Sequence, residues 1–235
     1  MDSQIKTARI AGFTYLIVII TGILCLQYIP SKLKLPDEVT QFKAEIPAFL
    51  PLFKIGIVCE IICWTSFLVL PFILYKLFKP VNDFYAKIMV AFALVQVPIS
   101  FVNLSNKFAV INLLSNSGYP KMYTEGQLHT HVKFYLDLYH DGNFVNHIFW
   151  GLWLLPFGYL VYRSGFIPKI LGILLMAGCF GYLIDFFGTF LFPTYDQTFI
   201  PHYIMLPASL GEVGICLWLM IIGVKKKQSN NTLFN

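Results

Sequence analysis

Six long apolar stretches constrain the fold of this chain more than any other feature of its sequence. A helix that crosses the hydrocarbon layer of a membrane, about 30 Å thick, needs roughly 20 predominantly apolar residues. Stretches of this kind cover residues 9–29, 52–76, 86–113, 144–162, 169–192 and 202–224. Turn and helix-stop residues such as Pro80 and Gly165 separate them. We therefore predict an all-α fold, a polytopic transmembrane helical bundle with six spans.

The composition agrees with this prediction. Hydrophobic residues make up 57% of the 235 residues and charged residues only 12%, about half of the roughly 25% that soluble domains carry. Because no long hydrophilic stretch interrupts the chain, we expect a single integral membrane domain over residues 1–235. The five cysteines lie inside apolar stretches, where they behave as small hydrophobic residues and predict no disulfide framework.

The placement of Lys and Arg predicts how the bundle is oriented. The N-terminal side and alternate loops carry ten basic residues against two acids: Lys6, Arg9, Lys76, Lys79, Lys87, Arg163, Lys169, Lys225, Lys226 and Lys227. The other side carries seven acids and as many basic residues, which are Lys32, Lys34, Lys43, Lys54, Lys107, Lys121 and Lys133. The positive-inside rule then places both termini in the cytoplasm. The basic residues are scattered rather than gathered in a patch, so they predict no nucleic-acid partner.

One connecting segment, residues 122–139, has the pattern of an amphipathic helix. Leu128, Val132 and Tyr139 recur at helical spacing among polar residues such as His129 and Lys133. Two interpretations fit this pattern equally well. The segment either lies on the outer membrane surface or extends the fourth span outward.

Polar residues of five spans fall at a similar depth. Glu60, Asn103, His147 and Asp185 each lie 16 residues from a basic residue at the inner end of their span, and Glu212 lies 13 residues from Lys225. At 1.5 Å per residue these separations correspond to about 24 and 20 Å. We therefore predict an acidic, outward-opening pocket in the outer half of the bilayer. Its expected ligand-binding residues are Glu60, Asn103, Asn143, His147, Asp185 and Glu212.

An alternative is that these residues only fix the packing of the helices. Hydrogen bonds between membrane helices stabilise by about 0.6 kcal/mol on average. Placing a carboxylate at the centre of a span costs about 2.5–3.5 kcal/mol on insertion scales. Asn or Ser would serve packing at a lower cost, so the three carboxyl groups favour a functional pocket.

Three functions are consistent with such a pocket. A transporter or channel would bind or move a small molecule or cation. An intramembrane enzyme would use a divalent metal on a lipid-like substrate, with His147, Glu60, Asp185 and Glu212 as candidate ligands. A sensor or assembly subunit would bind a lipid or another protein. Phosphate loops, dinucleotide fingerprints and serine nucleophile motifs are absent, and a bundle of this size would need to form a homo-oligomer to enclose a large pathway.

Three parts of the sequence resemble a bacterial membrane protein family known as a domain of unknown function. They are Ala8 to Gly12 with Tyr15 and Leu16, Phe149 to Phe166, and Pro168 to Asp185. The resemblance covers almost the whole chain. It implies a six-helix protein of the bacterial cytoplasmic (inner) membrane, and it implies no activity.

Overall fold

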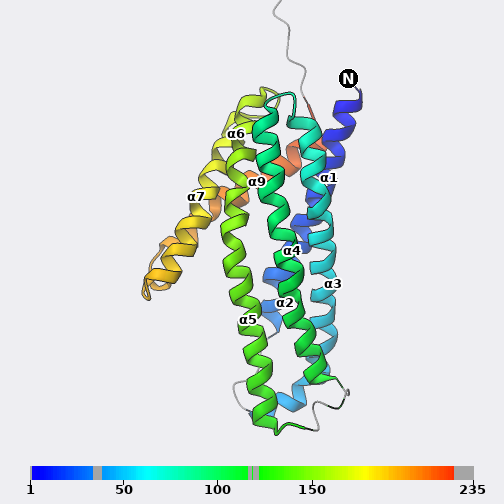
Figure 1. Cartoon of the computed structure of the whole chain (residues 1–235), viewed down its shortest axis with the longest axis vertical. Coiled ribbons are helices and arrows are strands. Elements are labelled where there is room, and N and C mark those ends of the chain that lie inside the picture. The colour runs from blue at the N-terminus through cyan, green and yellow to red at the C-terminus, as the bar shows by residue number, and fades with distance from the viewer. Residues whose placement is uncertain (1, 34–38, 116–117, 119–121, 225–235) are drawn as a thin grey trace, which may run out of the picture. The chain divides into compact units, whose positions relative to one another are not determined.

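Helices make up most of the part of the protein that the computed structural model describes, residues 2–33, 39–115, 118 and 122–224. Figure 1 shows these helices coloured along the chain. Their bounds are α1 (Asp2–Ile23), the π-helical turn η1 (Leu24–Tyr28), α2 (Ile29–Lys32), α3 (Val39–Phe78), α4 (Asp83–Leu114), α5 (Glu125–Leu152), α6 (Leu154–Ser164), α7 (Lys169–Leu191), the short 3-10 helix η3 (Tyr195–Gln197), α8 (Ile200–Ile204) and α9 (Leu206–Ile221).

Six helical segments within the described residues are long and apolar enough to cross a membrane. They are Ser3–Lys32, Glu45–Phe78, Asp83–Leu114, Glu125–Ser164, Lys169–Leu191 and Ile200–Ile221. The prediction of six transmembrane helices is therefore confirmed. Several of these segments extend beyond the apolar stretches, because the ends of a membrane helix are polar and hydropathy does not mark them.

Proline and glycine explain where the helices change or end. Pro156 and Pro207 have no backbone N–H, and each lies within the first three residues of a helix, α6 or α9. The chain therefore passes from α5 to α6 and from α8 to α9 within a single membrane segment. Gly165 ends α6 with φ of +72°, a conformation that side chains disfavour.

The chain is divided into two compact units. Unit 1 comprises residues Met1–Leu16, Leu70–Phe92 and Trp150–Asn235, and unit 2 comprises Ile17–Val69 and Ala93–Phe149. Helices α1, α3, α4 and α5 each contribute residues to both units. The expectation of a single integral membrane domain stays a prediction.

The basic residues from which the orientation of the bundle was predicted lie in unit 1. The start of α1, the turn between α3 and α4, the turn between α6 and α7, and the end of α9 lie at one end of this unit (Figure 1). Its exposed basic residues belong to these helix ends: Lys6, Arg9, Lys76, Lys79, Lys87, Arg163 and Lys169. Lys225 to Lys227 lie outside the described residues. The arrangement agrees with the positive-inside argument, while the cytoplasmic placement of the termini stays a prediction.

Glycines allow the helices of unit 1 to pack closely. A Cβ atom on Gly158 of α6 would come within 2.6 Å of the Gly172 carbonyl oxygen of α7. A Cβ atom on Gly178 of α7 would likewise lie 2.7 Å from Ala208 of α9. Small residues at these contacts let the backbones of membrane helices approach one another.

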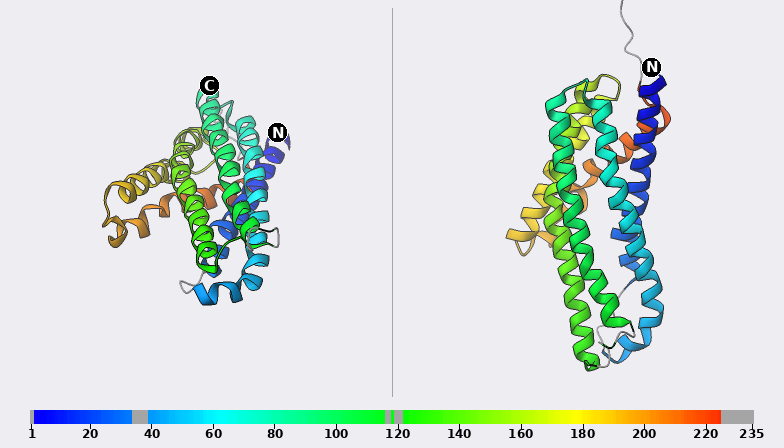
Figure 2. Two further views of the ribbon diagram at one scale, coloured as in Figure 1. Left: turned by 60° about the horizontal axis from the view of Figure 1, so that its bottom comes forward. Right: turned by 45° about the vertical axis from the view of Figure 1, so that its right-hand side comes forward.

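Unit 2 contains a core that joins α3, α4 and α5. Figures 1 and 2 show these three helices side by side in this unit. The core consists of Phe49, Phe53 and Ile57 of α3, of Leu104, Val110, Leu113 and Leu114 of α4, and of Leu128 and Val132 of α5.

The amphipathic segment at 122–139 becomes the start of the fourth membrane segment from Glu125 onward. Helix α5 runs without interruption from Glu125 to Leu152. Leu128 and Val132 are buried in the core of unit 2, with Tyr135 and Leu136 packed against it. The structure therefore agrees with the second interpretation, in which this segment extends the fourth span.

We predict that Gly158→Ala lowers the free energy of unfolding by about 1–3 kcal/mol, the usual cost of overpacking. The reason is the Gly172 carbonyl, a backbone group that cannot move aside independently. Thermal unfolding in mild detergent, followed by tryptophan fluorescence, measures the change. Gly126→Ala in α5 is the matched control, because its new methyl group would meet nothing within 4 Å. Equal stability of the two variants would contradict the proposed close packing.

Candidate functional site

A buried ion pair lies in unit 2, between two helices that span the membrane. Glu60 of α3 is 0% exposed and Lys107 of α4 is 5% exposed. The Lys107 ammonium donates a hydrogen bond of 2.6 Å to Glu60 Oε2. The hydroxyl of Tyr139, on α5, donates to the other carboxylate oxygen, Oε1, at 2.8 Å. Both oxygens of Glu60 therefore have protein partners.

Tyr139 also contacts Lys107 through its ring. The Lys107 Nζ atom lies 3.9 Å from the centroid of the Tyr139 ring, which is well within the range of a cation–π interaction. The three residues Glu60, Lys107 and Tyr139 are called the buried ion-pair cluster below. One positive and one negative group face each other in it, so the surroundings of Glu60 are neutral rather than acidic.

Three asparagines extend this cluster along α4 and α5. The Asn103 side-chain amide donates to the backbone carbonyl of Tyr139 at 2.8 Å and to Asn143 Oδ1 at 3.2 Å. Asn106 donates in turn to Asn103 Oδ1 at 3.1 Å. Gly142 leaves the space that the Asn103 amide occupies. These bonds fix the position of α5 against α4 beside Glu60.

The same face of α4 is polar over several turns. Gln96, Ser100, Asn103 and Lys107 are all buried and recur at helical spacing. Asn146 of α5 donates to Ser100 Oγ at 2.7 Å and to the Gln96 carbonyl at 3.3 Å. Polar contacts therefore follow the α4–α5 interface from Gln96 to Lys107 of α4.

The second buried carboxyl group, Glu212, lies in unit 1. Tyr15 of α1 is 1% exposed and donates a hydrogen bond of 2.7 Å to Glu212 Oε1 of α9. Close packing brings α1 and α9 together, since a Cβ atom on Gly12 would lie 2.5 Å from the Met220 nitrogen. Among the residues that the structure describes, Glu212 forms no ion pair with Lys, Arg or His.

The structure thus places the six predicted site residues in two groups. Unit 2 holds Glu60, Asn103, Asn143 and His147, and unit 1 holds Asp185 and Glu212. Glu60, Asn103 and Asn143 are linked through Tyr139, whereas half-buried His147 lies beside the Phe144 ring at 5.9 Å between centroids. One pocket common to all six residues stays a prediction.

Two residues of the cluster were missing from the predicted site. Lys107 was counted among the outer basic residues, although it lies inside the predicted span 86–113. Its position four residues after Asn103, on the same helix face, is the signal that identifies it. Tyr139 was assigned to the apolar face of the 122–139 segment, and nothing in its local pattern marks it as a partner of Glu60.

The candidate metal ligands do not assemble in the described part of the chain. No group of three His, Cys, Asp or Glu side chains there is arranged to hold a metal ion. His147, Glu60, Asp185 and Glu212 therefore provide no geometric support for a metal-dependent enzyme, and their role as ligands stays a prediction.

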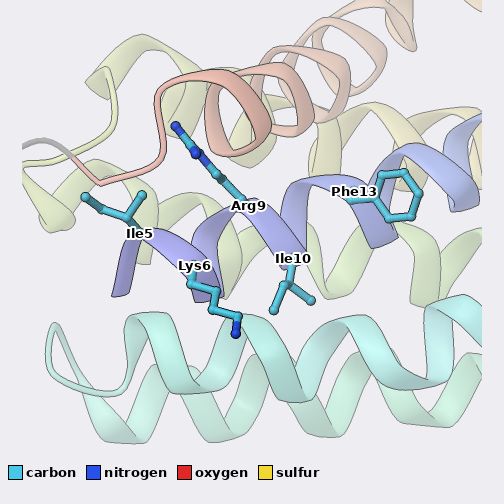
Figure 3. A pocket seen from close by; sticks show the side chains of 5 residues that line it. All are labelled: Ile5, Lys6, Arg9, Ile10 and Phe13. Carbon is cyan, nitrogen blue, oxygen red and sulfur yellow. The ribbon is translucent and has the colours of Figure 1, made fainter. Parts of the chain in front are cut away.

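A groove on the surface of unit 1 involves none of the predicted site residues. It has a volume of about 490 Å³ and is lined by Ile5, Lys6, Arg9, Ile10 and Phe13 of α1. Figure 3 shows the Lys6 and Arg9 side chains pointing to different sides of this helix. Apolar side chains next to basic ones are typical of a helix end at the membrane interface.

We predict that Lys107→Ala lowers the free energy of unfolding by about 3–5 kcal/mol, because it leaves the Glu60 charge buried without a partner. The exposed pair of Lys87 and Asp83 is the matched control, since it has the same 2.6 Å separation with side chains 66% and 42% exposed. Lys87→Ala should change stability little. Denaturant titration in mixed micelles measures both variants, and the prediction is wrong if they are equally stable.

Comparisons with known proteins identify the family. The family model described as a domain of unknown function (DUF4386) matches residues 10–223. An uncharacterised protein of Archaeoglobus fulgidus is 33% identical over 108 residues, which are 45% of this chain and 58% of that protein. No solved structure matches the chain. Since the family model covers most of the sequence, the resemblance noted above is confirmed, and the chain belongs to the DUF4386 family.

Proposed function

We propose that this multi-pass membrane protein binds or transports a small molecule or cation at a polar site around Glu60. The proposal places it in the bacterial cytoplasmic membrane with both termini in the cytoplasm. The observation that carries the functional part is the ion pair of Glu60 and Lys107, buried between two membrane-spanning helices.

The cost of burying such a pair supports a function beyond packing. An ionised residue within a membrane helix costs up to about 2.5–3.5 kcal/mol on insertion scales, with the highest cost at the centre of the helix. Such residues commonly mark ion or substrate pathways. Pairing offsets part of this cost, yet apolar residues of similar volume are often as stabilising as a buried ion pair. Packing of α3 against α4 therefore does not require these two charges.

The geometry of the cluster suggests that a cation binds by exchange. Both oxygens of Glu60 are already bonded, so an incoming cation has to displace the Lys107 ammonium or the Tyr139 hydroxyl. The long, flexible Lys107 side chain is the group more easily displaced.

The contacts around Glu60 favour this proposal over the two alternatives. An intramembrane metalloenzyme would need a ligand set, and the described residues form none. An assembly subunit would need a partner surface, whereas the polar contacts of the cluster lie inside unit 2. The proposed site is therefore a neutral ion pair rather than the acidic pocket predicted from the sequence. A cation binds there by displacing one partner of Glu60.

Flux measurements in proteoliposomes test the proposal. Vesicles containing the protein are given a membrane potential, and the uptake of sodium, potassium or ethylammonium is recorded. We predict flux above that of protein-free vesicles for the unmodified protein. The Glu60→Gln variant should return to the protein-free level, because it cannot exchange a cation for the Lys107 ammonium.

The control for flux is the Lys87→Gln variant, which removes an exposed ion pair and should leave the flux unchanged. The transport part of the proposal fails if the unmodified protein carries no flux with any test cation. It fails equally if Glu60→Gln, shown to be folded by its elution in gel filtration, carries the same flux as the unmodified protein.

The orientation can be tested in intact bacterial cells. In a cysteine-free background, we predict that a membrane-impermeant maleimide added outside labels Thr194→Cys, between α7 and α8. Lys79→Cys, between α3 and α4, should be labelled only after the cells are broken. Both positions are exposed in the structure, so burial does not explain a difference. The reverse pattern would place the termini outside the cytoplasm.

A further inference from the structure

Two cysteines of unit 2 lie together on neighbouring helices. Cys25 belongs to the π-helical turn η1 and is 1% exposed, and Cys63 belongs to α3 and is 3% exposed. A π-helical turn changes the helical register of the residues it contains, and such turns occur frequently at functional sites. Both cysteines lie within segments that are apolar enough to span the membrane.

The backbone of α1 brings the two sulfur atoms together at Gly22. The Cys25 thiol donates to the Gly22 carbonyl oxygen at 3.6 Å. The Cys63 sulfur lies 3.6 Å from the position that a Gly22 Cβ would occupy, and its thiol donates to the Val18 carbonyl oxygen, also at 3.6 Å. Both sulfur atoms therefore lie beside the same residue of α1, Gly22.

The other cysteines provide a comparison. Cys59 lies one helical turn before Cys63 on α3 and is only half-buried. Cys179 and Cys216 belong to unit 1, where the Cys216 thiol donates to the Gly12 carbonyl oxygen. Within the described residues, Cys25 and Cys63 are the two cysteines whose sulfur atoms lie beside one glycine, Gly22.

We propose that Cys25 and Cys63 form a redox-active dithiol, which closes to a disulfide between η1 and α3 by exchange with a small apolar disulfide compound. An apolar compound is required because both thiols are buried in membrane-spanning segments, which a charged reagent does not enter readily. The proposal rests on the contacts at Gly22 and is independent of the function proposed for Glu60.

The exchange proceeds in two steps that balance without any other oxidant. The thiolate of one cysteine attacks a sulfur of the apolar disulfide, which breaks its S–S bond, forms a mixed disulfide and releases one small thiol that takes up the proton. The second cysteine then attacks the protein sulfur of the mixed disulfide and releases the second small thiol. Two protein thiols and one small disulfide thus become one protein disulfide and two small thiols.

The experiment uses 4,4′-dithiodipyridine, a small apolar disulfide, on the reduced full-length protein in mild detergent. Remaining thiols are then blocked, and peptides are mapped by mass spectrometry without reduction. We expect a peptide that links Cys25 to Cys63, and its disappearance after treatment with a phosphine reductant. Cys59 should instead keep one pyridyl group in the same sample, because no neighbouring thiol resolves its mixed disulfide.

Single variants identify the roles of the two thiols. Cys25→Ser should leave a trapped pyridyl group on Cys63, and Cys63→Ser should leave one on Cys25. Cys59→Ser is the matched control and should close as the unmodified protein does. The proposal is overturned if Cys25 and Cys63 remain thiols, or each retain a pyridyl group, in a sample in which Cys59 has reacted completely.

A charged reagent tests the apolar requirement. The dianionic aromatic disulfide 5,5′-dithiobis(2-nitrobenzoate) should leave the pair open in the native protein and should react with it in dodecyl sulfate. If it closes the native pair as fast as 4,4′-dithiodipyridine does, the reaction proceeds through an opened state and the assignment of an apolar co-reactant is wrong.

Discussion

Inside a membrane, the protein has to supply a partner for each of its own polar groups, because hydrocarbon offers no hydrogen bonds. The helices meet this constraint for the backbone. Side chains meet it through a chain of contacts in unit 2, where Lys107 and Tyr139 take the two oxygens of Glu60. The Tyr139 carbonyl accepts from Asn103, which is bonded to Asn143. Three helices are thereby held in one register, since a shift of any one of them would leave a buried polar group unpaired.

Much of the fold follows from the sequence because hydropathy reports directly on membrane insertion. The six apolar stretches became six membrane segments, and Gly165 ends its helix as its residue type predicts. The start of the fourth segment was ambiguous for a physical reason. A helix with one apolar face has the same pattern whether that face meets lipid or another helix. Only the side chains of α3 and α4 around Leu128 and Val132 distinguish the two cases.

The site was harder to predict, because its contacts join residues far apart in the sequence. The carboxylate at Glu60 was recognisable from its position in an apolar stretch. Its partner, Lys107, lies 47 residues away, and a rule based on loop charges assigns any lysine near a helix end to the membrane surface. Cys25, which lies beside Gly22 together with Cys63, belongs to a π-helical turn, and such a turn breaks the regular spacing that sequence patterns assume.

The ion pairs Lys87–Asp83 and Lys107–Glu60 have the same 2.6 Å separation, but their side chains have different surroundings when each pair opens. Lys87 and Asp83 meet water, so their pairing has little consequence. Lys107 has the Tyr139 ring at 3.9 Å, and Glu60 has the Tyr139 hydroxyl at 2.8 Å. If a cation takes the place of the Lys107 ammonium at Glu60, that ammonium stays over an aromatic face instead of entering hydrocarbon. A cation–π contact is strongest where water is excluded, so Tyr139 lowers the cost of opening the pair. In the proposed exchange at Glu60, the contribution of Tyr139 is therefore to hold the displaced ammonium of Lys107.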